Sequence, residues 1–275
     1  MDLGESRGAE AAFLEGLGRE PSHSWSRAYA QSVSTSVSFG SVLAGKYPSA
    51  IPLCGRGAPG STPAWCASYP PDTPSLPVVL GHYGYESLWL HDNSLEGEAF
   101  SEVFGQVQGF EGSPSEVALD MATSLSSWWQ GQTLVPRIAV LTLGDLLAER
   151  EELAAALRAS PGDAYRQEAR ALGTRLGLVL EGLDTTPWIV VAGLHGQDLG
   201  ESQPSRRMPP SPFFHDILLE RTVHVPLWAF GPGEGGSDAI VEIRQILPTL
   251  LGLSGAELPA GAAGSLLDPL SGPVT

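Results

Sequence analysis

The chain has 275 residues, of which 42% are hydrophobic and 17% are charged, a composition that supports a buried core and argues against a disordered chain. Acidic side chains outnumber Lys and Arg by 31 to 15, which gives a net charge of −16. Because phosphate backbones bind clustered cations, this charge argues against nucleic acid as a partner. No run of 18 apolar residues and no signal-peptide pattern occurs, so the sequence predicts no transmembrane segment.

A cluster of hydroxyl side chains, which includes Thr35 and Ser38, runs into an apolar stretch within residues 31–48. This pattern predicts a helix with hydroxyl groups at its amino terminus. A hydroxyl group placed there meets unpaired backbone N–H groups and the positive end of the helix dipole, which suits both capping and anion binding. The residues alone leave open whether the cluster caps the helix or supplies a nucleophile.

The following segment, residues 48–77, is rich in proline and holds both cysteines, Cys54 and Cys66. We expect an irregular surface loop here. Two cysteines are too few for a disulfide framework, and their spacing does not match a zinc site. They either form one disulfide in an oxidising compartment or remain as two free thiols.

Beyond residue 85, short apolar, β-prone runs alternate with helical patterns. The runs are mostly continuous, as in strands that are buried on both faces. This order predicts an α/β fold in which helices flank a mostly parallel sheet. We expect one domain over residues 1–258, followed by a Gly/Ala/Pro-rich tail, residues 259–275, that finishes the domain or is partly disordered. Strands are predicted at residues 86–91, 137–142, 187–192 and 223–230, and helices at residues 146–159, 163–183 and 238–253, the last interrupted by Pro248.

Two histidines lie close to these predicted strands. His195 comes just after the run 187–192, and His215 precedes the run 223–230. Catalytic groups and ligands gather at the carboxyl ends of strands in α/β folds, and a neutral imidazole is a common metal ligand. A structural role for either histidine is the alternative.

Taken in chain order, these segments resemble the sulfatase branch of the alkaline phosphatase superfamily. Within that branch they are most similar to lipoteichoic acid synthases and phosphoglycerol transferases. The similarity covers residues 13–267. Residues 28–48 resemble the nucleophile segment of that family, and residues 195–201 resemble its Ser-Asp-His-Gly-Glu metal motif. Further similarities, in the same order as in the family, lie at residues 83–93, 109–110, 165–183, 225–232, 246–255 and 264–266.

The resemblance implies a divalent cation (Mg, Mn, Ca or Zn), held by carboxylates and a histidine, that activates a hydroxyl nucleophile toward a sulfate or phosphate ester. Thr35 takes the place of the nucleophile and also of a metal ligand, and His195 takes the place of a second metal ligand. The resemblance assigns catalysis to His215 as well, and substrate binding to Ser38 and Lys46.

The sequence departs from this family at the metal site. Leu194 stands where the family has an aspartate ligand, Phe39 stands where sulfatases have an arginine, and the acidic first strand has no counterpart, with Asp2 alone near its expected end. A hard cation binds several oxygen ligands, so these departures predict a degenerate metal site. The missing strand leaves a sheet edge that either an unrecorded segment or a partner completes.

Two functional predictions follow from the resemblance. The first is a pseudoenzyme that binds an anionic sulfate- or phosphate-ester small molecule, glycan or lipid headgroup. The alternative is an active metal-dependent phosphoglycerol transferase, phosphodiesterase or sulfatase, whose missing ligands come from an unrecorded amino-terminal segment, or from Asp198 or Glu201. The resemblance also implies an extracytoplasmic or membrane-associated location.

Overall fold

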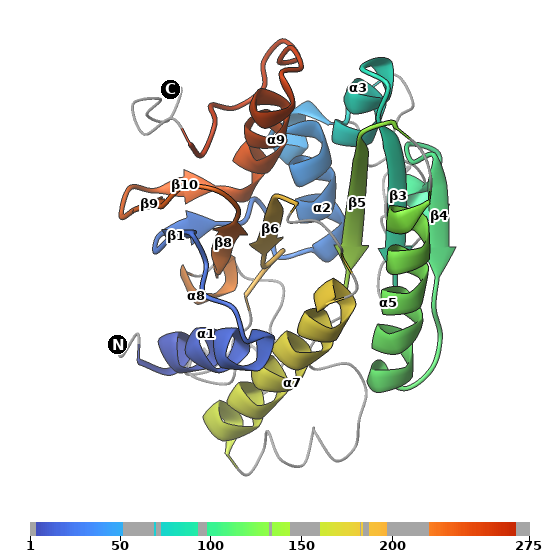
Figure 1. The fold of residues 1–275 in the computed structure, drawn as a ribbon. Helices are drawn as coiled ribbons and strands as arrows, with labels where there is room; N and C mark the ends of the chain where they lie inside the picture. The colour runs from blue at the N-terminus through green and yellow to red at the C-terminus, as the bar shows by residue number, and fades with distance from the viewer. Residues whose placement is uncertain are drawn as a thin grey trace, which may run out of the picture.

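The computed structural model of the chain describes residues 4–51, 69, 73–92, 98–131, 134–143, 160–181, 183, 187–196 and 220–267. Figure 1 shows strands in the middle of the domain with helices packed around them. The helices are α1 (Gly4–Leu17), α2 (Thr35–Ala44), α3 (Leu76–His82), α4 (Glu98–Ser101), α5 (Pro114–Gln130), α7 (Pro161–Glu181), α8 (Glu220–Val223) and α9 (Ile246–Ser254). The strands are β1 (His23–Trp25), β2 (Ala28–Tyr29), β3 (Glu86–His91), β4 (Gln106–Gly109), β5 (Arg137–Thr142), β6 (Ile189–Ala192), β7 (His224–Val225), β8 (Leu227–Phe230), β9 (Gly235–Ser237) and β10 (Val241–Glu242).

One sheet is parallel and has the strand order β4-β3-β5. Its central strand β3 is buried on both faces. Leu88 packs against α5 and α7, whereas Trp89 packs against Phe39 of α2. The predicted strands at residues 86–91 and 137–142 are confirmed as β3 and β5.

A second sheet has the order β6-β8-β1-β9, and β8 runs antiparallel to both β6 and β1. The prediction of one parallel strand at residues 223–230 is therefore wrong. Pro226 lacks a backbone N–H group and interrupts the ladder, so β7 pairs with β2 in a separate small sheet while β8 pairs with β6. The carbonyl of Pro226 still accepts a hydrogen bond of 3.0 Å from the N–H of Gly193.

Helices α1 and α7 cross at very close range beside these sheets. A methyl group added to Gly16 would lie 2.1 Å from the carbonyl oxygen of Arg170, and one added to Gly173 would lie 2.1 Å from that of Phe13. Only glycine permits this approach of two backbones. The helix predicted at residues 163–183 is confirmed as α7, and the helix predicted at residues 146–159 lies outside the described residues.

The carboxyl-terminal part differs from the predicted helix at residues 238–253. The strands β9 and β10 and a 3-10 turn, Ile243–Gln245, come first, and α9 begins only at Ile246. Pro248 lies in the first turn of α9, where its missing N–H group costs no helical hydrogen bond, so it does not interrupt the helix. Beyond α9 the chain still packs on the domain, because the N–H of Leu266 donates to Thr249 Oγ1 at 2.8 Å.

Helices cover both faces of the parallel sheet. Helices α5 and α7 share one apolar cluster with the side chains of β3 and β5, and α2 packs on the opposite face. Among the described residues, no helix combines the length and the apolar character needed to cross a lipid bilayer. The α/β class predicted from the sequence is confirmed, with the strands divided over three sheets.

Candidate functional site

Thr35 is the first residue of α2. Ser34 precedes it in extended conformation and makes no side-chain cap, although its own N–H donates to Ser32 Oγ at 3.0 Å. The first-turn N–H groups of α2 therefore receive no capping side chain from Ser34, and no acidic residue lies in that turn. This end of the helix presents N–H donors and a positive dipole beside the Thr35 hydroxyl.

His195 lies in the loop that follows β6. Two backbone hydrogen bonds fix this loop, from Gly193 N–H to Pro226 at 3.0 Å and from Gly196 N–H to Thr222 at 2.9 Å. Thr222 is fully buried, so the anchor is part of the core. The contacts with Pro226 and Thr222 thus hold the loop that carries the imidazole ring.

The structure brings Thr35 and His195 together. Thr35 Oγ1 lies 3.0 Å from His195 Nε2, and His195 Nδ1 lies 2.9 Å from the carbonyl oxygen of Gly196. A carbonyl oxygen only accepts hydrogen bonds, so Nδ1 carries a proton. In the neutral ring Nε2 is then an acceptor, and the Thr35 hydroxyl donates to it. This arrangement directs the oxygen lone pairs of Thr35 away from the histidine.

The residue before His195 faces the core. Leu194 packs against two apolar clusters, one that contains Phe39 and Trp89 and one that contains Leu227. Phe39 is itself buried, with its ring 5.6 Å from that of Trp89. Both positions at which the resemblance expects a charged side chain therefore hold packed apolar groups, which supply neither a metal ligand nor a support for the nucleophile.

The donors of this site do not fit the divalent cation that the resemblance implies. Thr35 and His195 offer one hydroxyl oxygen and one imidazole nitrogen. Within the part of the chain that the structure describes, no three His, Cys, Asp or Glu side chains are grouped to hold a metal ion. Mg²⁺ and Ca²⁺ take about six or more oxygen ligands, and Zn²⁺ takes about four ligands with at least three from the protein.

The other predicted residues are not at this site or lie outside the described residues. Ser38 is fully buried, and its hydroxyl donates to the Ser32 carbonyl oxygen at 3.0 Å. Lys46 follows the carboxyl end of α2, which at 1.5 Å per residue is about 15 Å along the helix from Thr35. Six residues that the sequence analysis singled out lie outside the described residues: Asp2, Cys54, Cys66, Asp198, Glu201 and His215.

His91 is a titratable group that the sequence interpretation missed. It is the last residue of β3, lies opposite Thr142 of β5, and is buried with its ring 4.6 Å from that of Trp89. Burial lowers the pKa of His91, and the nearby Asp92 opposes that shift. Its position at the carboxyl end of an apolar run was the available signal, because α/β sheets gather functional groups there.

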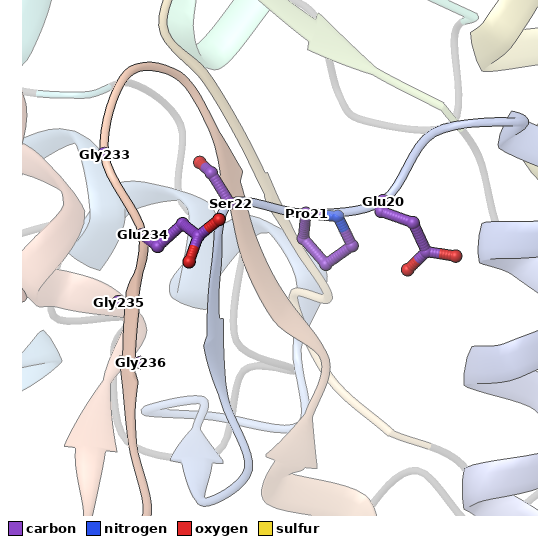
Figure 2. Close-up of a pocket in the computed structure, with 7 residues that line it drawn as sticks. All are labelled: Glu20, Pro21, Ser22, Gly233, Glu234, Gly235 and Gly236. Carbon is purple, nitrogen blue, oxygen red and sulfur yellow. The ribbon is translucent and has the colours of Figure 1, made fainter.

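A pocket of about 830 Å³ lies at the end of the mixed sheet β6-β8-β1-β9 that is remote from His195. Figure 2 shows its lining, in which Glu20, Pro21 and Ser22 face the glycine-rich loop 233–236. Because β8 is antiparallel to β6, this loop lies near the amino end of β6, away from His195. With Glu20 and Glu234 as its charged groups, the pocket does not suit an anionic ester.

Comparison with known proteins identifies the fold. A 2-O GAG sulfatase superposes with a TM-score of 0.61 at 16% identity, over 93% of this chain and 67% of its own. A phosphonate monoester hydrolase from Silicibacter pomeroyi gives a TM-score of 0.61 at 18% identity, over 97% and 72%. The chain has the sulfatase fold. A further sulfatase-fold neighbour, solved with its substrate D-glucosamine-2-N,6-O-disulfate, gives a TM-score of 0.63 at 14% identity, over 94% and 74%.

The sulfatase fold confirms the architecture that the sequence motifs predict. No protein-family model matches the sequence, and no curated protein matches it either. At 14–18% identity the similarity extends to the fold alone. Within this fold, the start of α2 and the loop after β6 meet at the carboxyl ends of the central strands, as Figure 1 shows.

Proposed function

We propose that this domain binds the anionic group of a sulfate or phosphate ester at Thr35 and His195, with weak or lost turnover. The contact of 3.0 Å between Thr35 Oγ1 and His195 Nε2 carries the proposal. The uncapped amino end of α2 supplies N–H donors for the oxygens of an oxyanion, and the Thr35 hydroxyl adds a further donor when its proton turns from His195 Nε2 toward the anion. The sulfatase-fold neighbour that binds a glucosamine disulfate supports a sugar sulfate as one substrate class.

The same geometry defines what residual catalysis would require. Thr35 Oγ1 attacks the sulfur or phosphorus atom, its proton passes to His195 Nε2, and the ester S–O or P–O bond breaks. The leaving alcohol takes that proton, and water later hydrolyses the covalent intermediate. Turnover stays weak because the described residues around the pair include apolar Leu194 and Phe39 in place of charged groups that would neutralise the ester oxygens.

Titration of the ¹⁵N-labelled protein with inorganic sulfate and phosphate, followed by NMR, tests the binding step. We expect saturable shifts at the amides of Thr35, Ser36 and His195, and smaller shifts elsewhere. Shifts spread evenly over the surface, or none at the start of α2, would contradict the proposal. Aryl sulfates and aryl phosphate mono- and diesters then test turnover, with Thr35→Val as the control for background hydrolysis.

A second candidate function is an active metal-dependent sulfatase, phosphodiesterase or phosphoglycerol transferase. It requires carboxylate ligands from residues that the structure does not describe or from a segment that adds to the domain. The observation that favours it is that, among the described residues, β5 and β6 each have a neighbouring strand on one edge only. Hydrolysis that depends on Mg²⁺, Mn²⁺, Ca²⁺ or Zn²⁺ and disappears in Thr35→Val would establish this candidate and exclude the first.

A further inference from the structure

Helix α8 lies between the two segments that carry the candidate site. On one side, the N–H of Gly196 donates to the carbonyl oxygen of Thr222 in α8 at 2.9 Å. On the other side, the N–H of Ala30 donates to the carbonyl oxygen of Val223 in α8 at 2.7 Å. Gly196 belongs to the loop after β6, and Ala30 belongs to the segment that leads into α2. A single helical turn therefore contacts both arms of the site.

A side-chain hydrogen bond adds a further contact at α8. The Tyr29 hydroxyl donates to Glu220 Oε1 at 2.5 Å, although the two residues are 191 positions apart in the chain. This hydrogen bond raises the pKa of Tyr29 above its ordinary value of 10.0, so the hydroxyl remains protonated and acts as the donor. The Tyr29 ring also contacts the ring of His224, with the two centroids 5.4 Å apart. Tyr29 is thus held at both ends of the segment 220–224.

Local hydrogen bonds connect the segment after Tyr29 to the start of α2. Gln31 Nε2 donates to the Tyr29 carbonyl oxygen at 3.1 Å. The N–H of Ser34 donates to Ser32 Oγ at 3.0 Å, and the Ser38 hydroxyl donates to the Ser32 carbonyl oxygen, also at 3.0 Å. The position of the first residue of α2 therefore depends on where this segment lies.

These contacts form a closed ring with the candidate site. From Tyr29 the ring passes through α8 to Gly196, whose carbonyl oxygen lies 2.9 Å from His195 Nδ1. The contact of 3.0 Å between Thr35 Oγ1 and His195 Nε2 closes it. The elements in the ring are short, because β2 and β7 have two residues each and α8 has four. Elements of this length gain little from their own backbone hydrogen bonds, so side-chain contacts fix where they lie.

We propose that Tyr29 is a positioning residue of the anion site, whose hydrogen bond to Glu220 holds α8 where it keeps His195 Nε2 within hydrogen-bond distance of Thr35 Oγ1. This inference rests on the proposed function, because it concerns the same pair of side chains. Tyr29 acts through α8 and the loop after β6. A hydrogen bond weakens steeply when its distance and angle depart from the optimum, so a displacement of α8 weakens the Thr35–His195 contact.

The ¹⁵N chemical shift of His195 Nε2 tests this role without any ligand. Thr35→Val removes the hydroxyl and defines the signal of a ring nitrogen that has lost this hydrogen bond. We expect the Nε2 signal of Tyr29→Phe to lie between those of the wild type and Thr35→Val. Tyr47→Phe is the matched control, because the Tyr47 hydroxyl also donates to a carboxylate, that of Glu242 at 3.0 Å, but lies beyond the carboxyl end of α2. We expect its Nε2 signal to stay at the wild-type value.

Titration with inorganic sulfate tests the consequence for binding. We expect Tyr29→Phe to bind sulfate about threefold more weakly than the wild type, and Tyr47→Phe to match the wild type. Glu220→Gln and Glu220→Ala remove the same charge, but only glutamine keeps an oxygen that accepts a hydrogen bond from Tyr29. We expect the glutamine variant to bind sulfate about threefold more tightly than the alanine variant. Equal affinities for these two variants would overturn the proposal.

The ring-nitrogen signal also separates this inference from the proposed function. If the Nε2 signal moves in Thr35→Val and keeps its wild-type value in Tyr29→Phe, the positioning role is overturned. The same holds if Tyr29→Phe and Tyr47→Phe lower the melting temperature equally and neither moves the signal, because Tyr29 then has a structural role only. If the signal moves in Tyr29→Phe but the wild type binds no sulfate, the proposed function is overturned and the positioning role of Tyr29 is supported.

Discussion

Thr35 Oγ1 and His195 Nε2 lie 3.0 Å apart although the two residues are separated by 160 positions in the chain. The contact joins the start of α2 to the loop after β6, and therefore joins this helix to the mixed sheet β6-β8-β1-β9. Because Nδ1 of the ring is committed to the Gly196 carbonyl oxygen, the hydrogen bond has one direction in the neutral state.

Replacing Thr35 tests the role of its hydroxyl group. Thr35→Val keeps the shape of the side chain and removes the hydroxyl, so we expect sulfate affinity to fall about tenfold, or about 1.4 kcal/mol. Thr35→Ser keeps the hydroxyl, and its affinity stays within about threefold of the wild type. Both values come from the NMR titration with sulfate. Equal affinities for the valine and serine variants would show that the helix amino terminus binds sulfate without the hydroxyl.

Replacing Leu194 tests the loss of the metal site. Leu194→Asp places a carboxylate among apolar clusters, so we expect the free energy of unfolding to fall by about 2–4 kcal/mol in metal-free buffer. Leu194→Asn is the matched uncharged control. Excess Mn²⁺ should raise the melting temperature of the aspartate variant and leave that of the asparagine variant unchanged, because the carboxylate adds an oxygen ligand beside His195. An unchanged stability of Leu194→Asp without metal would contradict the packing role of Leu194.

The close crossing of α1 and α7 gives a prediction about stability. Gly173→Ala introduces a methyl group 2.1 Å from the Phe13 carbonyl oxygen, so we expect a loss of about 2–4 kcal/mol by urea denaturation. Gly252→Ala is the control, because Gly252 lies in α9 with no atom within 4 Å of the added methyl group. We expect it to gain about 0.5–1 kcal/mol from helix propensity. A neutral Gly173→Ala would mean that the two helices do not cross as closely as described.

The burial of His91 predicts a pH dependence of stability. Its pKa in the folded state lies below the ordinary 6.5, so folding disfavours the protonated ring. Above about pH 6.5 the His91 ring is neutral in both the folded and the unfolded state, so its titration does not reduce the free energy of unfolding. As the pH falls below that value, the unfolded state binds the proton first and the domain loses stability. We expect the free energy of unfolding of His91→Gln to depend less steeply on pH than that of the wild type between about pH 7.5 and 5.5, as measured by urea denaturation at each pH.

Patterns in the sequence predicted the parallel part of the fold better than the rest. The runs 86–91 and 137–142 have continuous apolar centres, residues 88–90 and 138–141, and match β3 and β5, since such a run is the local signal of a strand that packs on both faces. Helix α1 was not predicted, because its glycines lower the helix propensity of the segment and its packing against α7 is a tertiary contact that the local pattern does not contain. The division of residues 223–230 depends on which neighbours the strands find on either side of Pro226, which the local pattern does not contain.

The candidate site was also predicted only in part, because side-chain contacts between distant segments are not contained in the local sequence pattern. Motif order pointed to Thr35 and His195, and the structure brings these two side chains together. The motif also joined Ser38 and Lys46 to them, but helix geometry buries the first and separates the second by the length of α2. His91 was missed because it ends a run whose apolar side chains, Leu88, Trp89 and Leu90, indicated a core strand.

Metal content measures the central claim most directly. The purified protein and a His195→Ala variant are incubated separately with Mg²⁺, Mn²⁺, Ca²⁺ and Zn²⁺, freed of excess metal, and subjected to elemental analysis. The described donors at Thr35 and His195 include no carboxylate, so we predict far less than one metal ion per chain and no difference between the two proteins. One metal ion per chain that disappears in His195→Ala would contradict a degenerate site and favour the metal-dependent candidate.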